Sequence, residues 1–278
     1  MDRTPTFGSL VAALLVLSAV FWAIERWRPS IRGQRRTRGQ TRVDIAYWFF
    51  TPIITRGVTR FAVGVVFAFV ALSQGVTLQE LQRLATTRQT WASSLPLIVQ
   101  VPLLLLLADL LAYWSHRWFH GERLWRFHAI HHSSKTVDWL SSVRLHPVND
   151  AVSRIVQVLP LYWMGFNGAA LAAFVPFLTF YSLLLHANVS WSYGPLRYVI
   201  ASPAFHRWHH TTEREGLDKN FANMFPFIDL AFGTFYMPAG RQPQEFGILG
   251  DEVPNGLLAQ LAYPFRVPVQ SRDSEQAL

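Results

Sequence analysis

The chain contains no cysteine. Disulfide bonds and cysteine-ligated iron–sulfur clusters are therefore excluded. The sequence also lacks a GxGxxG phosphate loop after a strand, which is the usual signature of dinucleotide binding. Any electrons that this chain uses must therefore come from a separate protein.

Charged residues are scarce, at 15% of the chain, whereas 51% of the residues are hydrophobic and 14% are aromatic. The mean hydropathy of +0.18 is too high for an ordinary soluble domain. The composition therefore predicts an integral membrane protein. The formal net charge of +8 does not indicate nucleic-acid binding, because the basic residues concentrate beside apolar stretches, where they act as membrane-surface and topology signals.

Three apolar stretches predict membrane-spanning helices: Phe7–Ile24, Ile45–Leu72 and Leu95–Trp114. A helix rises about 1.5 Å per residue, so stretches of this length can cross a hydrocarbon core of about 30 Å. We expect the first to be retained rather than cleaved as a signal peptide. Bulky Phe21 and Trp22 stand where small residues normally precede a cleavage site.

The second apolar stretch contains Pro52, Arg56 and Arg60. We therefore expect its first part to lie along the membrane interface, while 61–72 completes a crossing. The polar segment 73–94 is expected to form an outer loop.

The last long apolar region, Val148–Asn188, is interrupted by the sequence GFNG at 165–168, which is a strong turn signal. It predicts a helical hairpin that either crosses and returns or dips into the bilayer, so that both ends lie on one side. Seven arginines in 26–42 mark that loop as cytoplasmic by the positive-inside rule. Counting crossings from this loop places the histidines on the cytoplasmic face.

All ten histidines lie between His116 and His210, and eight of them form three clusters, HRWFH, HAIHH and HRWHH. On a helix, residues three or four apart share a face, so each cluster can bind a metal ion. Neutral imidazole suits zinc, copper, iron and nickel. There are too many rings for one ion, so the pattern predicts two ions with four or five nitrogens each. Carboxylates are few in this window, and the ExxH pairs of carboxylate-bridged di-iron bundles are absent.

Asp109 is an ionisable residue inside the apolar run LLLLLADLLAYW. Such residues are costly in a bilayer and usually functional. Asp109, Tyr113, His116 and His120 fall on one helical stripe. We expect Asp109 to accept a ring N–H from a metal-bound histidine. The alternative is an ion pair with Arg56 or Arg60.

Three segments carry a resemblance to a known family: DLLAYWSHRWFH, LWRFHAIHHSS and HRWHHTTEREGLDKNFANMFPFIDLAFGTFY. Together they resemble the fatty acid hydroxylase and sterol desaturase superfamily over Asp109–Met237. The match includes the three histidine boxes in order and the lone His186. It also includes D-x-N and D-x-x-FGT elements at Asp218, Asn220 and Asp229.

The resemblance implies a membrane-bound, non-haem di-iron enzyme that uses O₂ and two electrons to hydroxylate or desaturate a C–H bond of a lipid, such as a sterol or a fatty acyl chain. It implies nine metal ligands: His116, His120, His128, His131, His132, His186, His206, His209 and His210. His146 is a possible tenth, and a structural hydrogen bond is its equal alternative. Four residues are expected to support the ligands by hydrogen bonding: Asp109, Tyr113, Asp218 and Asn220. No side chain is assigned as a nucleophile or general base.

The sequence as a whole predicts an all-α membrane helical bundle with a cytoplasmic, histidine-rich helical cap. Residues 1–94 form an N-terminal membrane region, 95–240 the catalytic domain and 241–278 a cytoplasmic tail. The excess of arginine over lysine suggests a bacterial inner membrane. The electron donor is expected to be a separate ferredoxin-like protein or small cytochrome, attracted by the basic cytoplasmic surface.

Two other functions compete with this interpretation. A zinc-dependent lipid hydrolase would use a metal-bound water to attack an ester or amide, but it would leave half of the histidines without a role. A bis-histidine haem protein needs only a few facing histidines deep within the spans. Five aromatic residues near the boxes are also candidates to line a lipid entry route: Trp114, Trp118, Phe119, Trp125 and Phe127.

Overall fold

The computed structural model describes residues 5–34, 40–87, 89–166, 168–250 and 252–266. Over these residues the secondary structure is helical, and the β-type pairing it shows is an isolated bridge between Thr211 and Phe246. Within the described part of the chain, three helices are long and apolar enough to cross a membrane: Phe7–Trp27, Thr41–Ser73 and Leu97–Phe119. The fold is thus a membrane helical bundle, as the composition predicts.

Helix α1 (Phe7–Trp27) begins at Thr6, whose side chain accepts a hydrogen bond from the Ser9 backbone N–H at 3.2 Å. Large apolar side chains on α1 and α3 (Arg56–Ser73) are strongly exposed, Leu15 by 66% and Leu72 by 78%. An exposed apolar surface of this kind suits contact with lipid.

The second span differs from the prediction at Pro52. Helix α2 (Thr41–Phe50) and α3 are joined by a π-helical turn, Thr51–Thr55, in which the Arg56 N–H donates to the Thr51 carbonyl. The result is one continuous helix of 33 residues rather than an interrupted one. A proline ring normally clashes with the carbonyl four residues earlier, and a widened turn relieves that clash without ending the helix.

The polar segment between the second and third spans is also more ordered than expected. It contains helix α4 (Leu78–Thr87), where the sequence indicated only a loop. The third span, α5 (Leu97–Phe119), continues past the expected end at Trp114 and carries His116 within its last turn. Gly121 then separates α5 from α6 (Glu122–His132).

The predicted helical hairpin is present as α7 (Pro147–Met164) and α8 (Gly168–His186). Gly165 ends α7 in the left-handed conformation, with φ of 80°. A Cβ at this position would also lie 2.4 Å from the Thr90 Oγ1, so only glycine fits this turn. Asn167 of the GFNG signal lies outside the described residues.

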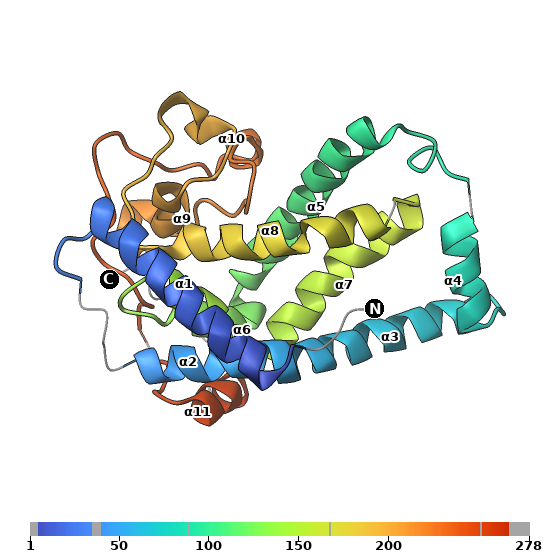
Figure 1. Cartoon of the computed structure of the whole chain (residues 1–278), viewed down its shortest axis with the longest axis horizontal. Coiled ribbons are helices and arrows are strands. Elements are labelled where there is room, and N and C mark those ends of the chain that lie inside the picture. Colours follow the sequence, from blue (N-terminus) through green and yellow to red (C-terminus); the bar gives the residue numbers. More distant parts are fainter. Residues whose placement is uncertain (1–4, 35–39, 88, 167, 251, 267–278) are drawn as a thin grey trace.

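The bundle is splayed at one end and capped at the other (Figure 1). Helices α3, α5 and α7 extend to the right of that view, towards α4, and α7 packs against both α3 and α5. On the left, α6 gathers with the short helices α9 (Pro203–His209), α10 (Phe227–Ala231) and α11 (Leu257–Ala262). Short 3₁₀ turns complete this cap at Trp139–Val143, Gly194–Tyr198, Arg214–Gly216 and Tyr263–Phe265.

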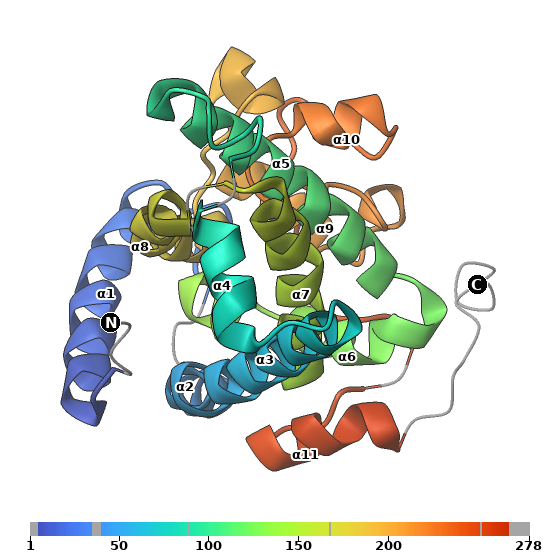
Figure 2. The same cartoon turned by 90° about the vertical axis from the view of Figure 1, so that its right-hand side faces the viewer.

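Helix α1 lies at the edge of the molecule beside α8 (Figure 2). Its Phe21 is fully buried and stacks on Trp139, with ring centroids 5.1 Å apart. Glu25, near the end of α1, accepts the Asn188 backbone N–H at 3.0 Å, just after α8 ends. These contacts attach the first span to the cap that carries the histidines.

Candidate metal centre

The nine histidines predicted as ligands converge from four helices that are far apart in sequence. The end of α5 supplies His116 and His120, and the end of α8 supplies His186. The other six come from α6 and α9: His128, His131, His132, His206, His209 and His210. Each helix presents its histidines at or near its C-terminal end, so the rings meet where the helices terminate.

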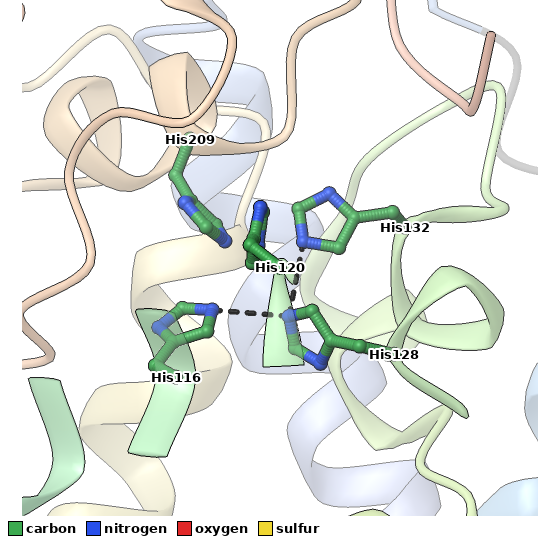
Figure 3. A group of neighbouring side chains, drawn as sticks. All are labelled: His116, His120, His128, His132 and His209. Carbon is green, nitrogen blue, oxygen red and sulfur yellow. Dashed lines mark hydrogen bonds between the residues drawn. The ribbon is translucent and has the colours of Figure 1, made fainter. Parts of the chain in front are cut away.

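The rings form two groups, and within each group the potential ligand nitrogens all lie within 4.8 Å of one another. The five-histidine group contains His116, His120, His128, His132 and His209 (Figure 3). The four-histidine group contains His131, His186, His206 and His210. The division into five and four matches the number of nitrogens expected for two ions.

Helical spacing explains how each HxxHH box contributes histidines to both groups. His128 and His132 are one turn apart on one face of α6, whereas His131 points to the neighbouring group. The last box divides in the same way, with His209 in one group and its neighbours in the other. The groups are adjacent, because the ring centroids of His132 and His210 lie 4.3 Å apart.

Six of the rings are oriented through Nδ1. In the five-histidine group, four rings donate from Nδ1, each at 2.8 Å. His116 donates to the Phe221 carbonyl and His209 to the Lys219 carbonyl. His120 donates to Asp218 Oδ1 and His128 to Asn149 Oδ1. In the four-histidine group, His131 donates to the Arg144 carbonyl at 3.1 Å and His186 to the Ser182 carbonyl at 2.8 Å. A carbonyl oxygen only accepts, so these bonds place the proton on Nδ1 and leave a lone pair on Nε2 of the neutral ring.

The inward-facing Nε2 atoms are too close to be stable without a cation. Nε2 of His116 lies 3.0 Å from Nε2 of His128, and Nε2 of His131 lies 3.2 Å from Nε2 of His186. All four rings carry their proton on Nδ1, so lone pair faces lone pair in both contacts. In addition, the Nε2 of His209 is buried without a hydrogen-bond partner among the described residues. Both groups therefore fit a bound metal ion.

The protonation of the rings agrees with a role as ligands. Burial, reinforced by the neighbouring histidines, holds the pKa of the α6 and α9 box histidines well below the ordinary value of 6.5. Neutral imidazole is the form that binds transition metals. The rings are thus ready to bind at neutral pH.

The expected supporting residues divide into two classes. Asp218 contacts a candidate ligand directly, since it accepts the His120 N–H. Asn220 instead bonds the backbone of Phe205 and Tyr236, at 2.7–2.8 Å. The Tyr113 hydroxyl bonds Thr234 Oγ1 at 3.0 Å and accepts from Arg117.

Asp109 has partners different from those expected. Its two oxygens accept the backbone N–H groups of Asn223, Met224 and Phe225 at 2.7–3.1 Å. Neither a histidine ring nor Arg56 or Arg60 occupies these positions. The position of Asp109 in an apolar helix drew attention to a buried carboxylate. It could not show that a loop more than a hundred residues later would supply the hydrogen-bond donors.

His146 lies outside both groups and is not a tenth ligand in this structure. Its Nδ1 accepts the Val148 backbone N–H at 3.1 Å and thereby caps α7. Its Nε2 donates to the Leu261 carbonyl at 3.2 Å. Both nitrogens are therefore used in structural hydrogen bonds. Asn149, which orients His128, carries no motif that would identify it from the sequence.

A small cavity opens beside the five-histidine group. His120, His132 and His209 line it, together with Trp125, Asp218 and Ile248. The Trp125 ring lies against two of these histidines, with centroid distances of 5.1 Å to His120 and 5.3 Å to His132. Of the other aromatic candidates for a lipid route, Phe119 is buried against His128, whereas Trp118 is 53% exposed.

The family model described as fatty acid hydroxylase matches residues 101–234, which contain all nine histidines. Ornithine lipid hydroxylase of Rhizobium tropici is 31% identical to the chain over 251 residues, which cover 89% of this chain and 72% of the relative. The chain belongs to the fatty acid hydroxylase family. It is accordingly an oxidoreductase, and the sequence resemblance is confirmed.

Other relatives match over less of the chain. Alkylglycerol monooxygenase of Homo sapiens is 31% identical over 133 residues, 44% of this chain and 27% of the relative. A very-long-chain aldehyde decarbonylase of Oryza sativa subsp. japonica is 31% identical over 140 residues, 45% of this chain and 21% of the relative. The chain therefore spans about a quarter of these longer proteins. No solved structure gives a significant match.

Proposed function

We propose that this protein is a membrane-bound lipid hydroxylase or desaturase in which the nine histidines hold two iron ions. The observation that carries the proposal is the pair of adjacent groups of five and four buried imidazoles, whose Nε2 lone pairs point at one another. A ligand set made up of imidazole nitrogens suits a borderline transition metal such as iron. Family membership supports iron and O₂ rather than another metal and reaction.

When bound, the iron ions would supply the activation of O₂ that oxidises an unreactive C–H bond. For hydroxylation the reaction balances as R–H + O₂ + 2e⁻ + 2H⁺ → R–OH + H₂O. For desaturation the same oxidant removes two hydrogens from adjacent carbons, and both oxygen atoms leave as water. The two outcomes differ in the number of C–H bonds broken, one or two, and in whether an oxygen atom stays on the lipid.

The chain's own contribution is to hold the ligands rigidly and to keep water away. Seven of the nine rings are buried, and the Nδ1 hydrogen bonds fix the orientation of six. The histidines stand where the apolar helices α5 and α8 end. We expect a lipid to reach the site from the bilayer at these helix ends. One relative, which matches 89% of this chain, is an ornithine lipid hydroxylase, and this favours a lipid with a polar head group as substrate.

We place the histidines and the cap on the cytoplasmic face of a bacterial inner membrane. The arginines that follow α1 support this orientation, although Arg35, Arg36 and Arg38 lie outside the described residues. Because the chain has no cysteine, single-cysteine variants can test it. A cysteine at the exposed position Lys135 should resist a membrane-impermeant maleimide in intact cells and react after lysis.

The electrons would come from a separate ferredoxin-like or cytochrome-type protein. We propose that it docks over the opening beside Trp125, because this ring contacts two histidines of the five-histidine group at the edge of the cavity. If basic side chains attract an acidic donor, turnover should fall as salt is raised from low to physiological ionic strength. Turnover that is independent of salt would argue against this docking.

The structure gives no support to the two competing functions. A zinc hydrolase needs three protein ligands and a water, yet here two complete groups lie side by side. A haem held by two histidines needs a macrocycle between the axial nitrogens. The facing Nε2 atoms are 3.0–3.2 Å apart and leave no room for it.

The deciding experiment compares the lipids of cells with and without the protein under ¹⁸O₂. We expect a new lipid that gains one ¹⁸O atom, or a new double bond formed only when oxygen is present. The matched control is the His209→Ala variant, which should lose the product although the protein is still inserted. A product formed equally well without oxygen would refute the proposal and favour hydrolysis.

A further inference from the structure

The segment that follows the last histidine box, residues 218–225, orients only one of the two groups. We call it the ligand-orienting segment. Three rings of the five-histidine group donate their Nδ1–H to this segment. His120 donates to the Asp218 side chain, His209 to the Lys219 carbonyl and His116 to the Phe221 carbonyl. In the four-histidine group, the two rings with Nδ1 hydrogen bonds donate elsewhere, to Arg144 and Ser182.

The backbone of this segment is itself held by two buried carboxylates. Five consecutive N–H groups, from Phe221 to Phe225, donate to them. Asp229 accepts the first two at 2.7 and 2.9 Å, and Asp109 accepts the last three at 2.7–3.1 Å. The side chain of Asp229 is fully buried and Asp109 is 5% exposed. Hydrogen bonds to a buried carboxylate are stronger than those between neutral groups.

The segment needs this support because its conformation is unfavourable. Asp218 and Asn220 adopt left-handed backbone angles, with φ of 54° and 60°. Such angles cost free energy in residues other than glycine and persist when the surroundings fix them. Alternating left-handed residues allow the Asp218 side chain and the Lys219 and Phe221 carbonyls to face three different rings.

Asp109 links the segment back to the helix that carries two of the ligands. It lies on α5 two turns before His116 and three turns before His120. The segment is therefore fixed to α5 by Asp109 and returns hydrogen bonds to two rings of the same helix. The segment also bonds the backbone at and before α9, through Asn220 to the Phe205 carbonyl and through the Met224 carbonyl to the Ala201 N–H. The ring hydrogen bonds of His131 and His186 in the four-histidine group go to Arg144 and Ser182 instead of the segment.

We propose that Asp109 and Asp229 are positioning residues that set the five-histidine site through the ligand-orienting segment, so that the two metal sites are held independently. The proposal rests on the function proposed above, since it takes both groups to bind metal. An amide in place of Asp109 keeps one acceptor oxygen and turns its NH₂ group towards backbone N–H donors. The segment then loses part of its anchor, whereas the four-histidine group keeps all of its contacts.

The experiment titrates Co²⁺ into the purified, metal-free full chain in detergent micelles and measures the two binding constants by calorimetry. In the Asp109→Asn variant we expect one constant to stay unchanged and the other to weaken by about 10- to 100-fold. The matched control is Asp150→Asn on α7, which makes the same chemical change. Its carboxylate bonds Thr59 and Arg154 rather than the segment, so both constants should stay at the wild-type values.

The outcomes separate this inference from the proposed function. If the wild-type protein binds no Co²⁺ at all, the proposed metal centre itself is refuted. If it binds two ions and Asp109→Asn weakens both sites equally or neither, the positioning role is refuted while the metal centre stands. Should Asp109→Asn not fold, Asp218→Ala makes the same test. The Asp218 side chain is 34% exposed and accepts the His120 N–H, so loss at one site supports the inference and equal loss or none refutes it.

Discussion

A buried ion pair connects the N-terminal membrane region to the candidate metal centre and gives a quantitative prediction. The Arg144 guanidinium and the Asp44 carboxylate are both fully buried and directly hydrogen-bonded. Among the described residues, the other hydrogen-bond partners of the Arg144 guanidinium are neutral: Ser133 Oγ at 3.2 Å and Gln40 Oε1 at 3.4 Å. The same arginine offers its backbone carbonyl to His131. Removal of the Asp44 charge leaves an uncompensated buried cation.

The Asp44→Asn variant should lose about 3–5 kcal/mol of stability, the usual cost of breaking a buried ion pair. Reversible denaturation of the purified protein in mixed micelles measures this loss. The double variant Asp44→Asn/Arg144→Met should recover much of it, because it removes the unpaired charge as well. Glu252→Gln is the matched control, since its pair with Lys135 is largely exposed and should be dispensable. A loss below about 1 kcal/mol in the single variant, or no recovery in the double, would refute the reasoning.

Three further predictions concern the histidines. His131→Ala and His209→Ala should each lower the metal content and abolish turnover while the protein still inserts into the membrane. Metal analysis and product assays measure these effects. Full activity in either variant would remove that residue from the ligand set. His146→Ala should keep the full metal content but lose about 0.5–2 kcal/mol of stability, because it removes the cap of α7; loss of metal without unfolding would contradict this. Burial holds the pKa of His128 and His132 below 6.5, so the unfolded chain takes up more protons as the pH falls through that value. The melting temperature of the metal-free protein should therefore be highest above pH 6.5 and fall below it, and a constant value would contradict this.

Much of the architecture could be predicted because the membrane imposes simple rules. Long apolar runs such as 7–24 and 95–114 have few alternatives to a membrane-spanning helix, and glycines at a turn separate the arms of a hairpin. The HxxHH spacing likewise limits which rings can share a helical face. The convergence of the nine histidines follows from these patterns and the family resemblance together.

What could not be predicted depends on contacts between distant residues or on backbone adjustment. Pro52 indicated a break, but a π-helical turn absorbs it within a continuous helix. The apolar run around Asp109 predicted that this carboxylate has a role. Its hydrogen-bond partners, the backbone N–H groups of residues 223–225, depend on the path of a distant loop. His146 has the residue type of a ligand, and only its two backbone partners show that it caps a helix.

The most direct test of the account is the iron content of the purified protein, loaded with Fe²⁺ without oxygen and freed of loosely bound metal. Two adjacent imidazole groups predict two iron ions per chain. One ion per chain, or retention of zinc in preference to iron in an active enzyme, would contradict the proposed di-iron centre.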